Sequence, residues 1–123
     1  MSRESKVIVA SLAIAASTFA QGGEVVWRAD RSAQAEFTIA AAKFDEYCSR
    51  LSAGQKVEWK FDASAPVDFN IHYHEGEQVA YPAQQKAIES QQGVLDVSKD
   101  QNYCWMWQNR TSSPVSVEVR LRR

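Results

Sequence analysis

Three segments of this sequence alternate strictly between apolar and polar residues, and this alternation restricts the chain to a fold built from β-strands. The segments cover residues 56–61, 67–74 and 115–121. Successive side chains of a strand point to opposite faces, so each segment offers one apolar face to a core and one polar face to water. An amphipathic helix would instead repeat its apolar residues every three to four positions. Each segment is therefore expected to be a strand with one buried face.

Turn-forming residues separate these segments and indicate a fold of several short strands. Gly, Pro or Ser occurs in each of the stretches 52–55, 63–66, 74–77 and 112–114. Further candidate strands cover residues 24–28, 36–41, 78–81, 93–97 and 102–108, with one more around Cys48. Strands at this spacing predict an all-β, antiparallel β-sandwich. Residues 83–92 fit either a short helix or a glutamine-rich loop.

The first twenty residues have the layout of a secretion signal. Arg3 and Lys6 precede an uncharged run over residues 7–21, and small residues stand at Thr18 and Ala20. The run is shorter than the roughly 20 residues that a membrane-spanning helix needs. We expect cleavage after Ala20, export to the periplasm or the extracellular space, and a single domain over residues 21–123. The alternative is a buried or membrane-anchoring helix that stays in place.

The charge of the chain gives no electrostatic reason to expect a polyanionic partner. The whole sequence has 14 Lys and Arg residues against 15 Asp and Glu residues, a net charge of −1. Loss of the first 20 residues removes two positive charges and one negative charge, so the net charge becomes about −2. The expected partner is a protein or a small ligand, and not nucleic acid or an anionic membrane. We predict no transmembrane segment in the mature chain, and the sequence does not indicate an oligomeric state.

The two cysteines, Cys48 and Cys104, predict a disulfide. An even number of cysteines in an exported chain favours a bond over free thiols, because the compartment is oxidising. The chain-entropy estimate of its contribution to stability is about 4 kcal/mol. The bond could join neighbouring strands or cross between sheets. If it crosses the core, Met106 points inward with Cys104 and the aromatic residues beside them point outward, where another segment covers them or they form a binding surface.

The order of features from Tyr47 to Leu121 resembles the GOLD domain, the luminal β-sandwich of the p24 cargo-receptor family. The resemblance rests on Tyr47-Cys48, the turn at 52–55, the strand at 57–61, Asp68-Phe69-Asn70-Ile71, Asn102-Tyr103-Cys104-Trp105, Asn109 and a last alternating strand. It implies a β-sandwich, pairing of the two cysteines, and contact with proteins or lipids. No coiled-coil repeat or transmembrane helix follows the domain in this sequence, so cargo sorting does not carry over.

The motif His72-Tyr73-His74 indicates a candidate metal site. Residues i and i+2 of a strand share a face, so two imidazoles would stand side by side. With Glu75 next to them and a thioether from Met106, the set would suit Cu(I) or Cu(II). The other interpretation is that both histidines are polar residues on the wet face of a strand. Apart from this copper hypothesis, the sequence predicts no cofactor.

The same pair of histidines defines a candidate binding surface. If their strand pairs with the Cys104 strand, Trp105 and Trp107 fall on the same outer face as His72 and His74. No spacing in the sequence assembles a nucleophile with a base, two placed carboxylates or a phosphate loop, so we expect no enzyme activity. We therefore predict an exported, non-enzymatic interaction domain, with a periplasmic copper-binding protein as the alternative. The sequence Asn109-Arg110-Thr111 also fits the N-glycosylation pattern.

Overall fold

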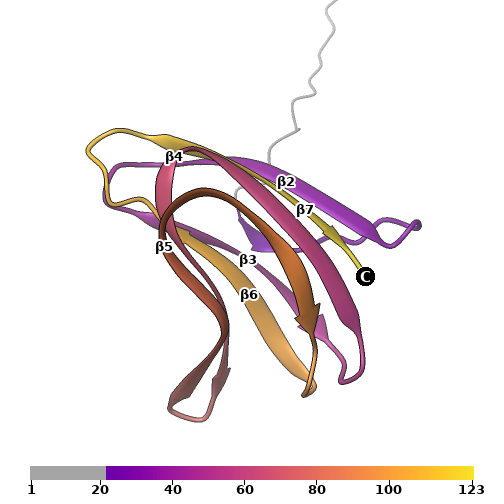
Figure 1. Cartoon of the computed structure of the whole chain (residues 1–123). Helices are drawn as coiled ribbons and strands as arrows, with labels where there is room; N and C mark the ends of the chain where they lie inside the picture. Colours follow the sequence, from indigo (N-terminus) through magenta and orange to yellow (C-terminus); the bar gives the residue numbers. More distant parts are fainter. Residues whose placement is uncertain (1–21) are drawn as a thin grey trace, which may run out of the picture.

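The computed structural model describes residues 22–123, which form seven β-strands and no helix (Figure 1). The strands are β1 (Gly23–Glu24), β2 (Ser32–Ile39), β3 (Phe44–Leu51), β4 (Lys56–Glu75), β5 (Gln78–Asp96), β6 (Gln101–Gln108) and β7 (Val115–Arg122). The fold is all-β, as the alternation predicts. Within the described range, no helix is long and apolar enough to cross a membrane. The predicted secretion signal and its cleavage site lie outside the described residues.

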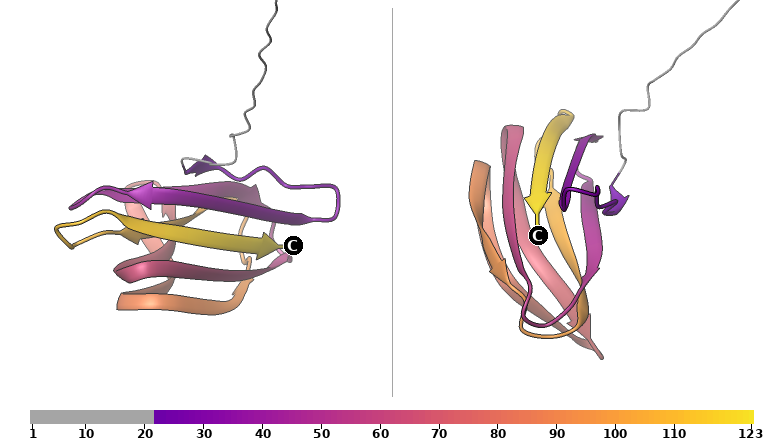
Figure 2. Two further views of the ribbon diagram at one scale, coloured as in Figure 1. Left: turned by 90° about the horizontal axis from the view of Figure 1, so that it is seen from above. Right: turned by 90° about the vertical axis from the view of Figure 1, so that its right-hand side faces the viewer.

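The fold has two layers, and the long hairpin of β4 and β5 takes part in both of them. Residues 58–63 of β4 pair with β7, which pairs with β2, whereas residues 68–72 of β4 pair with β6, which pairs with β3. The pairing is antiparallel throughout, except that β1 runs parallel to β3. One continuous sheet thus folds over itself around the hairpin. Figure 2 shows β2, β7, β4 and β5 side by side in one layer.

The bend of the hairpin lies where the sequence predicts a turn, at residues 63–66. β4 runs through this stretch as one strand, with register shifts against β5 on both sides of Val67. Bulges of this kind bend a strand, and Pro66 has no N–H for the ladder. Opposite the bend, Ala87 has a φ of 56°, and its N–H donates to Oδ1 of Asp68 at 3.0 Å. The prediction that residues 63–66 form a turn between two strands is therefore wrong, because these residues form a bend within β4.

The interpretation of residues 83–92 as a helix or a loop is also wrong, because these residues form the middle of β5. Among residues 22–123, the pairing partner of this strand is β4 alone, and the strand lies at the edge of the sheet. Most of its side chains are exposed, so it lacks the apolar alternation that marks the other strands. Backbone pairing with the long β4 strand holds it in place. Local sequence carries no signal of such pairing.

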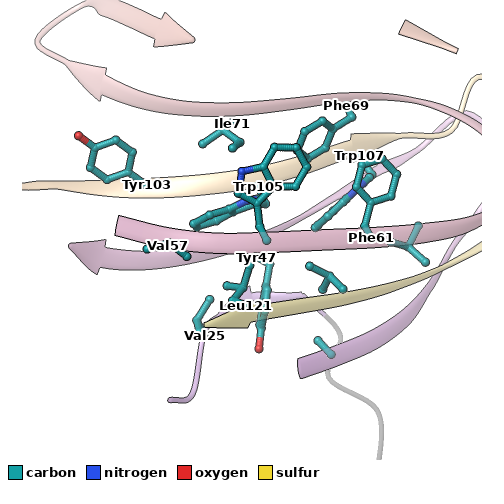
Figure 3. Close-up of a cluster of buried hydrophobic side chains, with 14 of the residues drawn as sticks. Val25, Tyr47, Val57, Phe61, Phe69, Ile71, Tyr103, Trp105, Trp107 and Leu121 are labelled. Carbon is teal, nitrogen blue, oxygen red and sulfur yellow. The ribbon is translucent and has the colours of Figure 1, made fainter. Parts of the chain in front are cut away.

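The inner faces of the two layers close on a cluster of aromatic rings (Figure 3). Phe61 and Phe69 lie 4.7 Å apart between ring centroids, and the Trp107 ring contacts Phe37 at 5.4 Å. The side chains of Trp105 and Trp107 have no exposed surface. Burial of rings of this size, each 150–250 Å² in general, is a large source of stability. The expectation that the aromatic residues beside Cys104 form an outward stripe is therefore wrong.

The disulfide between Cys48 and Cys104 is present, as predicted, and it joins neighbouring strands. The two residues are register partners on β3 and β6, with Cα atoms 4.1 Å apart. The bond lies on the outer face of its layer and does not cross the core. Successive side chains of β6 point to opposite faces of the sheet. Because Cys104 points outward, Trp105 and Trp107 point inward. Met106 follows the parity of Cys104 and also lies on the outer face.

A buried asparagine joins two loops at one end of the fold. The Nδ2 atom of Asn109 donates to the carbonyl oxygens of Ile39, Ala40 and Ser113 at 3.0, 3.2 and 2.8 Å. Its Oδ1 atom accepts from the N–H of Thr111 at 2.8 Å. The residue has no exposed surface. Its amide is therefore a structural bridge, and the folded domain does not present it for glycosylation.

Candidate functional site

The outer face of β3, β6 and β4 carries the buried histidine that the sequence singles out. His72 is the register partner of Cys104, which in turn is the partner of Cys48. Along the next row, Glu46 and Asn70 flank Met106 on its two sides. The inward neighbours Ile71 and Tyr73 are buried in the core, which anchors this part of β4. Two rows of polar and sulfur-containing side chains therefore lie next to each other on this face.

His72 is held by a side chain on each side of its ring. Its Nδ1 atom lies 2.7 Å from Oδ1 of Asn70. An amide oxygen only accepts, so Nδ1 carries the hydrogen and donates it. The Nε2 atom is then the unprotonated one in the neutral ring, and it lies 3.6 Å from Oε1 of Glu46. A lone pair and a carboxylate oxygen face each other, which is an arrangement that a cation would stabilise.

Burial keeps His72 in its neutral form. The residue is 7 % exposed, and removal from water lowers its pKa below the ordinary value of 6.5. The carboxylate of Glu46 works in the opposite direction, and the neighbouring His74 works in the same direction as burial. At neutral pH the ring is therefore uncharged, which is the state in which imidazole binds a metal.

Two further rings border His72. His74 is exposed, and its ring centroid lies 5.3 Å from that of His72 with the two rings nearly perpendicular. The ring of Tyr81 lies 6.1 Å from the His72 ring and is half exposed. His72, His74, Glu46, Asn70 and Tyr81 form what we call the His72 cluster. It combines one buried imidazole with one accessible imidazole, and a carboxylate contacts the buried one.

Of the other two predicted metal ligands, Glu75 lies on the opposite face of β4 from the histidines, whereas Met106 shares their outer face. Both carboxylate oxygens of Glu75 accept from Nζ of Lys99, at 2.9 and 3.0 Å, and the residue follows His74 on the opposite face of β4. Met106 lies on the outer face, half-buried, although the sequence had favoured a core position for it. Among the described residues, ligand atoms within 4.8 Å of one another belong to Glu46, His72 and Cys104. Cys104 is in the disulfide, so it offers no thiolate.

The predicted binding surface of two histidines and two tryptophans does not exist as one face. Trp105 and Trp107 are fully buried, on the side of the layer opposite to His72. The two strands do pair, as the prediction supposed. The tryptophans nevertheless lie on the opposite face from His72, because side chains alternate along β6 and these two point into the core. Only His72 and His74 remain on the outer face.

Sequence reasoning missed Glu46 and Tyr81 as members of the cluster. Asn70 could have been found, because it shares the parity of His72 on the same strand. Glu46 lies on β3, which β6 separates from β4. Its approach to His72 follows from the strand order, which no local pattern encodes.

Comparison with known proteins identifies the fold. No protein-family model matches the sequence, and no curated protein sequence matches it. Among solved structures, PliG of Aeromonas hydrophila, a periplasmic inhibitor of g-type lysozyme, matches with a TM-score of 0.61 and 21% identity over 83% of this chain and 95% of that chain. PliG of Salmonella Typhimurium matches with a TM-score of 0.57 and 13% identity over 84% and 97% of the two chains.

A third similar structure belongs to a different kind of protein. The pre-peptidase C-terminal domain of a Bacillus anthracis collagenase matches with a TM-score of 0.60 and 8% identity, over 83% of this chain and 93% of that domain. At these identities the similarity establishes the β fold alone. The comparisons do not confirm the resemblance to the GOLD domain, although they agree with the all-β fold that it implied.

Proposed function

We propose that this chain is an exported, non-enzymatic domain that binds a protein, and that its partner is a secreted hydrolase of the g-type lysozyme kind. The observation that carries the proposal is the similarity to the PliG of Aeromonas hydrophila, a periplasmic inhibitor of g-type lysozyme. That similarity spans 95% of the inhibitor. The sequence identity to the inhibitor is 21%, whereas the collagenase domain, whose TM-score is nearly equal, is only 8% identical to this chain.

Two properties of the molecule support this proposal. The Cys48–Cys104 disulfide suits a protein that works outside the reducing cytoplasm. His72 is 7 % exposed, so little of its ring meets the solvent, where a general acid or base would contact its substrate. Its two polar contacts, Asn70 and Glu46, fix the ring in place. A role in binding agrees with these features better than a role in catalysis.

The direct test is an inhibition assay with purified mature protein. A panel of lysozymes that includes a g-type enzyme is mixed with increasing amounts of the protein, and lysis of bacterial cell walls is followed. We expect stoichiometric inhibition of the g-type enzyme and a complex in isothermal titration calorimetry. Heat-denatured protein serves as the control. If the native protein neither binds nor inhibits any enzyme of the panel at micromolar concentrations, the hydrolase proposal is wrong.

The second candidate function is transition-metal binding at the His72 cluster. The observation that favours it is the orientation of His72, whose Nδ1 donates to Asn70 while Nε2 faces the carboxylate of Glu46 at 3.6 Å. Metal-binding histidines commonly donate their second ring nitrogen to an oxygen in this way. The exposed His74 would supply a third ligand by rotation of its side chain, with water in the remaining position.

The spacing of the two fixed ligand atoms selects among metals. In a tetrahedral Zn(II) site, bond lengths of about 2.1 Å place a nitrogen and an oxygen ligand about 3.4 Å apart. A square-planar Cu(II) site brings neighbouring ligand atoms to about 2.9 Å. The observed 3.6 Å is closer to the tetrahedral value. Zn(II) therefore fits this geometry better than square-planar Cu(II), one of the two copper ions that the sequence led us to expect.

Metal titrations of the apo-protein test this candidate. We expect one Zn(II) or Co(II) to bind, with Co(II) giving the visible absorption of a tetrahedral site. His72→Gln and Glu46→Gln should each weaken binding at least about tenfold, whereas Glu75→Gln, whose carboxylate binds Lys99, should not. Binding that persists in the His72→Gln, His74→Gln double variant would overturn the proposal, as would absence of binding at 100 μM metal.

A further inference from the structure

A trough crosses the outer face of the layer formed by β2, β7, β4 and β5. Its floor is a row of register partners whose side chains point into the core. The row consists of Ala33, Leu121, Trp59 and Gly93. The pocket that includes this floor has a volume of about 560 Å³. A volume of this size is typical of ligand-binding clefts in proteins.

Two rows of outward-pointing side chains form the walls of the trough. One wall consists of Ser32, Arg122, Glu58 and Val94, and the other of Gln34, Arg120, Lys60 and Gln92. Arg28, from the loop before β2, also lines the pocket. The trough crosses four strands, so it is about 14 Å long from the first to the last. An extended chain of about four residues matches this length.

The trough concentrates positive charge on a chain whose net charge is −1. Four of its lining residues are cationic and one, Glu58, is anionic. Within residues 22–123, no carboxylate forms an ion pair with Arg28, Lys60 or Arg122, and Arg120 has only a long contact of 3.7 Å with Glu118. Unpaired guanidinium groups around a concave surface attract carboxylates, which they bind with two parallel hydrogen bonds.

The remaining lining residues favour a peptide over a polysaccharide as the occupant. Gln34 and Gln92 offer side-chain amides that can bond to a peptide backbone, and Val94 is 56% exposed and available for apolar contact. The one aromatic residue of the lining, Trp59, is 6% exposed, and its ring points into the core. A sugar would therefore find no exposed aromatic ring on which to stack.

We propose that this trough binds an extended, acidic segment of a partner protein, with Lys60 and Arg120 as its central contacts. The inference rests on the proposed function in that it takes the ligand to be a protein, and it adds the chemistry of the contact. The charge balance of the whole chain gives no reason to expect an anionic ligand. The pairing of the four strands nevertheless places several cationic side chains around one concave site.

A short acidic peptide tests the proposal without knowledge of the partner. A fluorescein-labelled hexapeptide of alternating Asp and Glu is titrated with the mature protein, and fluorescence anisotropy is measured. Its Asn and Gln counterpart is the uncharged control. We expect binding of the acidic peptide to weaken at least about tenfold in the Lys60→Gln, Arg120→Gln double variant, because two charge-assisted contacts are lost. All the substituted side chains are exposed, and thermal melting verifies the fold of each variant.

A second double variant, Lys43→Gln with Lys86→Gln, removes the same charge from exposed positions outside the trough. It should change the affinity less than about twofold, because a specific site responds to local charge and not to net charge. Equal weakening in both double variants would overturn the proposal, and so would absence of binding. Polygalacturonate is tested in parallel. Tighter binding of this polysaccharide, lost in the trough variant, would identify an anionic glycan as the occupant and would also overturn it.

The same variants separate this inference from the proposed function. If the g-type lysozyme binds the wild-type protein and the Lys60→Gln, Arg120→Gln variant equally, the trough is not the docking site and the proposed function stands. If the acidic peptide binds in the trough but no lysozyme binds the protein, the hydrolase proposal fails and the trough stands. Loss of lysozyme binding in the trough variant alone supports both.

Discussion

Gly93 lies directly opposite Trp59 in the pairing of β5 with β4, and the indole ring occupies the space that a side chain at residue 93 would need. A β-carbon at this position would lie 2.8 Å from Cζ2 of Trp59 and 3.1 Å from Cε2. The ring is 6% exposed and packs against Phe69 at 5.1 Å between centroids, so it has little room to move. Glycine at this position is therefore a packing requirement of the core.

Gly93→Ala should lower the free energy of unfolding by about 2 kcal/mol, because the added methyl group forces the Trp59 ring from its position. Chemical denaturation followed by tryptophan fluorescence measures the change. Ser90→Ala, at an exposed position of the same strand, is the matched control and should change stability by less than about 0.5 kcal/mol. Equal stability of Gly93→Ala and wild type would show that the contact is looser than the structure indicates.

Replacement of both Cys48 and Cys104 by alanine should lower the free energy of unfolding by about 4 kcal/mol, mainly through the greater freedom of the unfolded chain. The two residues are 56 positions apart in the sequence and are already neighbours on paired strands. The folded state should therefore change little. Denaturation midpoints of the oxidised wild type and the double variant measure the effect. Unchanged midpoints, or two alkylated thiols in protein from its native compartment, would contradict this prediction.

Asn109→Asp should destabilise the fold by about 3 kcal/mol. The change removes the amide group that donates to the carbonyl oxygens of Ile39, Ala40 and Ser113, and it brings a buried carboxylate against them. Asn102 is exposed on β6, and Asn102→Asp is the control with the same chemical change. Thermal melts of the two variants at pH 7 compare them. Similar melting temperatures for both would mean that the bridge between the loops carries little energy.

The stability of the metal-free protein should decrease as the pH falls below about 6.5, the pKa of histidine in unfolded chains. Burial lowers the pKa of His72 in the folded state, so the unfolded chain binds the proton more readily. The loss continues until the pH reaches the lower pKa of the folded state. Denaturation in the presence of a chelator, between about pH 5.5 and 7.5, measures it. His72→Gln should flatten the curve, and equal slopes in variant and wild type would refute the assignment to His72.

Period-two alternation was sufficient to predict several strands and the residues that they bury. Val57, Trp59 and Phe61 alternate in the sequence and are all buried, and the turn predicted at 74–77 joins β4 to β5. Alternation predicts the buried face of these segments because one face is apolar and the other is polar, and the apolar face packs against the core. The same reasoning was ambiguous for residues 103–107, where both faces are apolar.

The sequence by itself determined the all-β class, the disulfide and the two histidines that share one face of a strand. Only the tertiary structure decided that the disulfide lies outside the core, that Trp105 and Trp107 fill it, and that Glu46 contacts His72. Local patterns are set by neighbours within a strand, where the side-chain period fixes which residues share a face. The order of strands and the side of the sheet that is buried depend on pairings between distant segments, which no local pattern encodes.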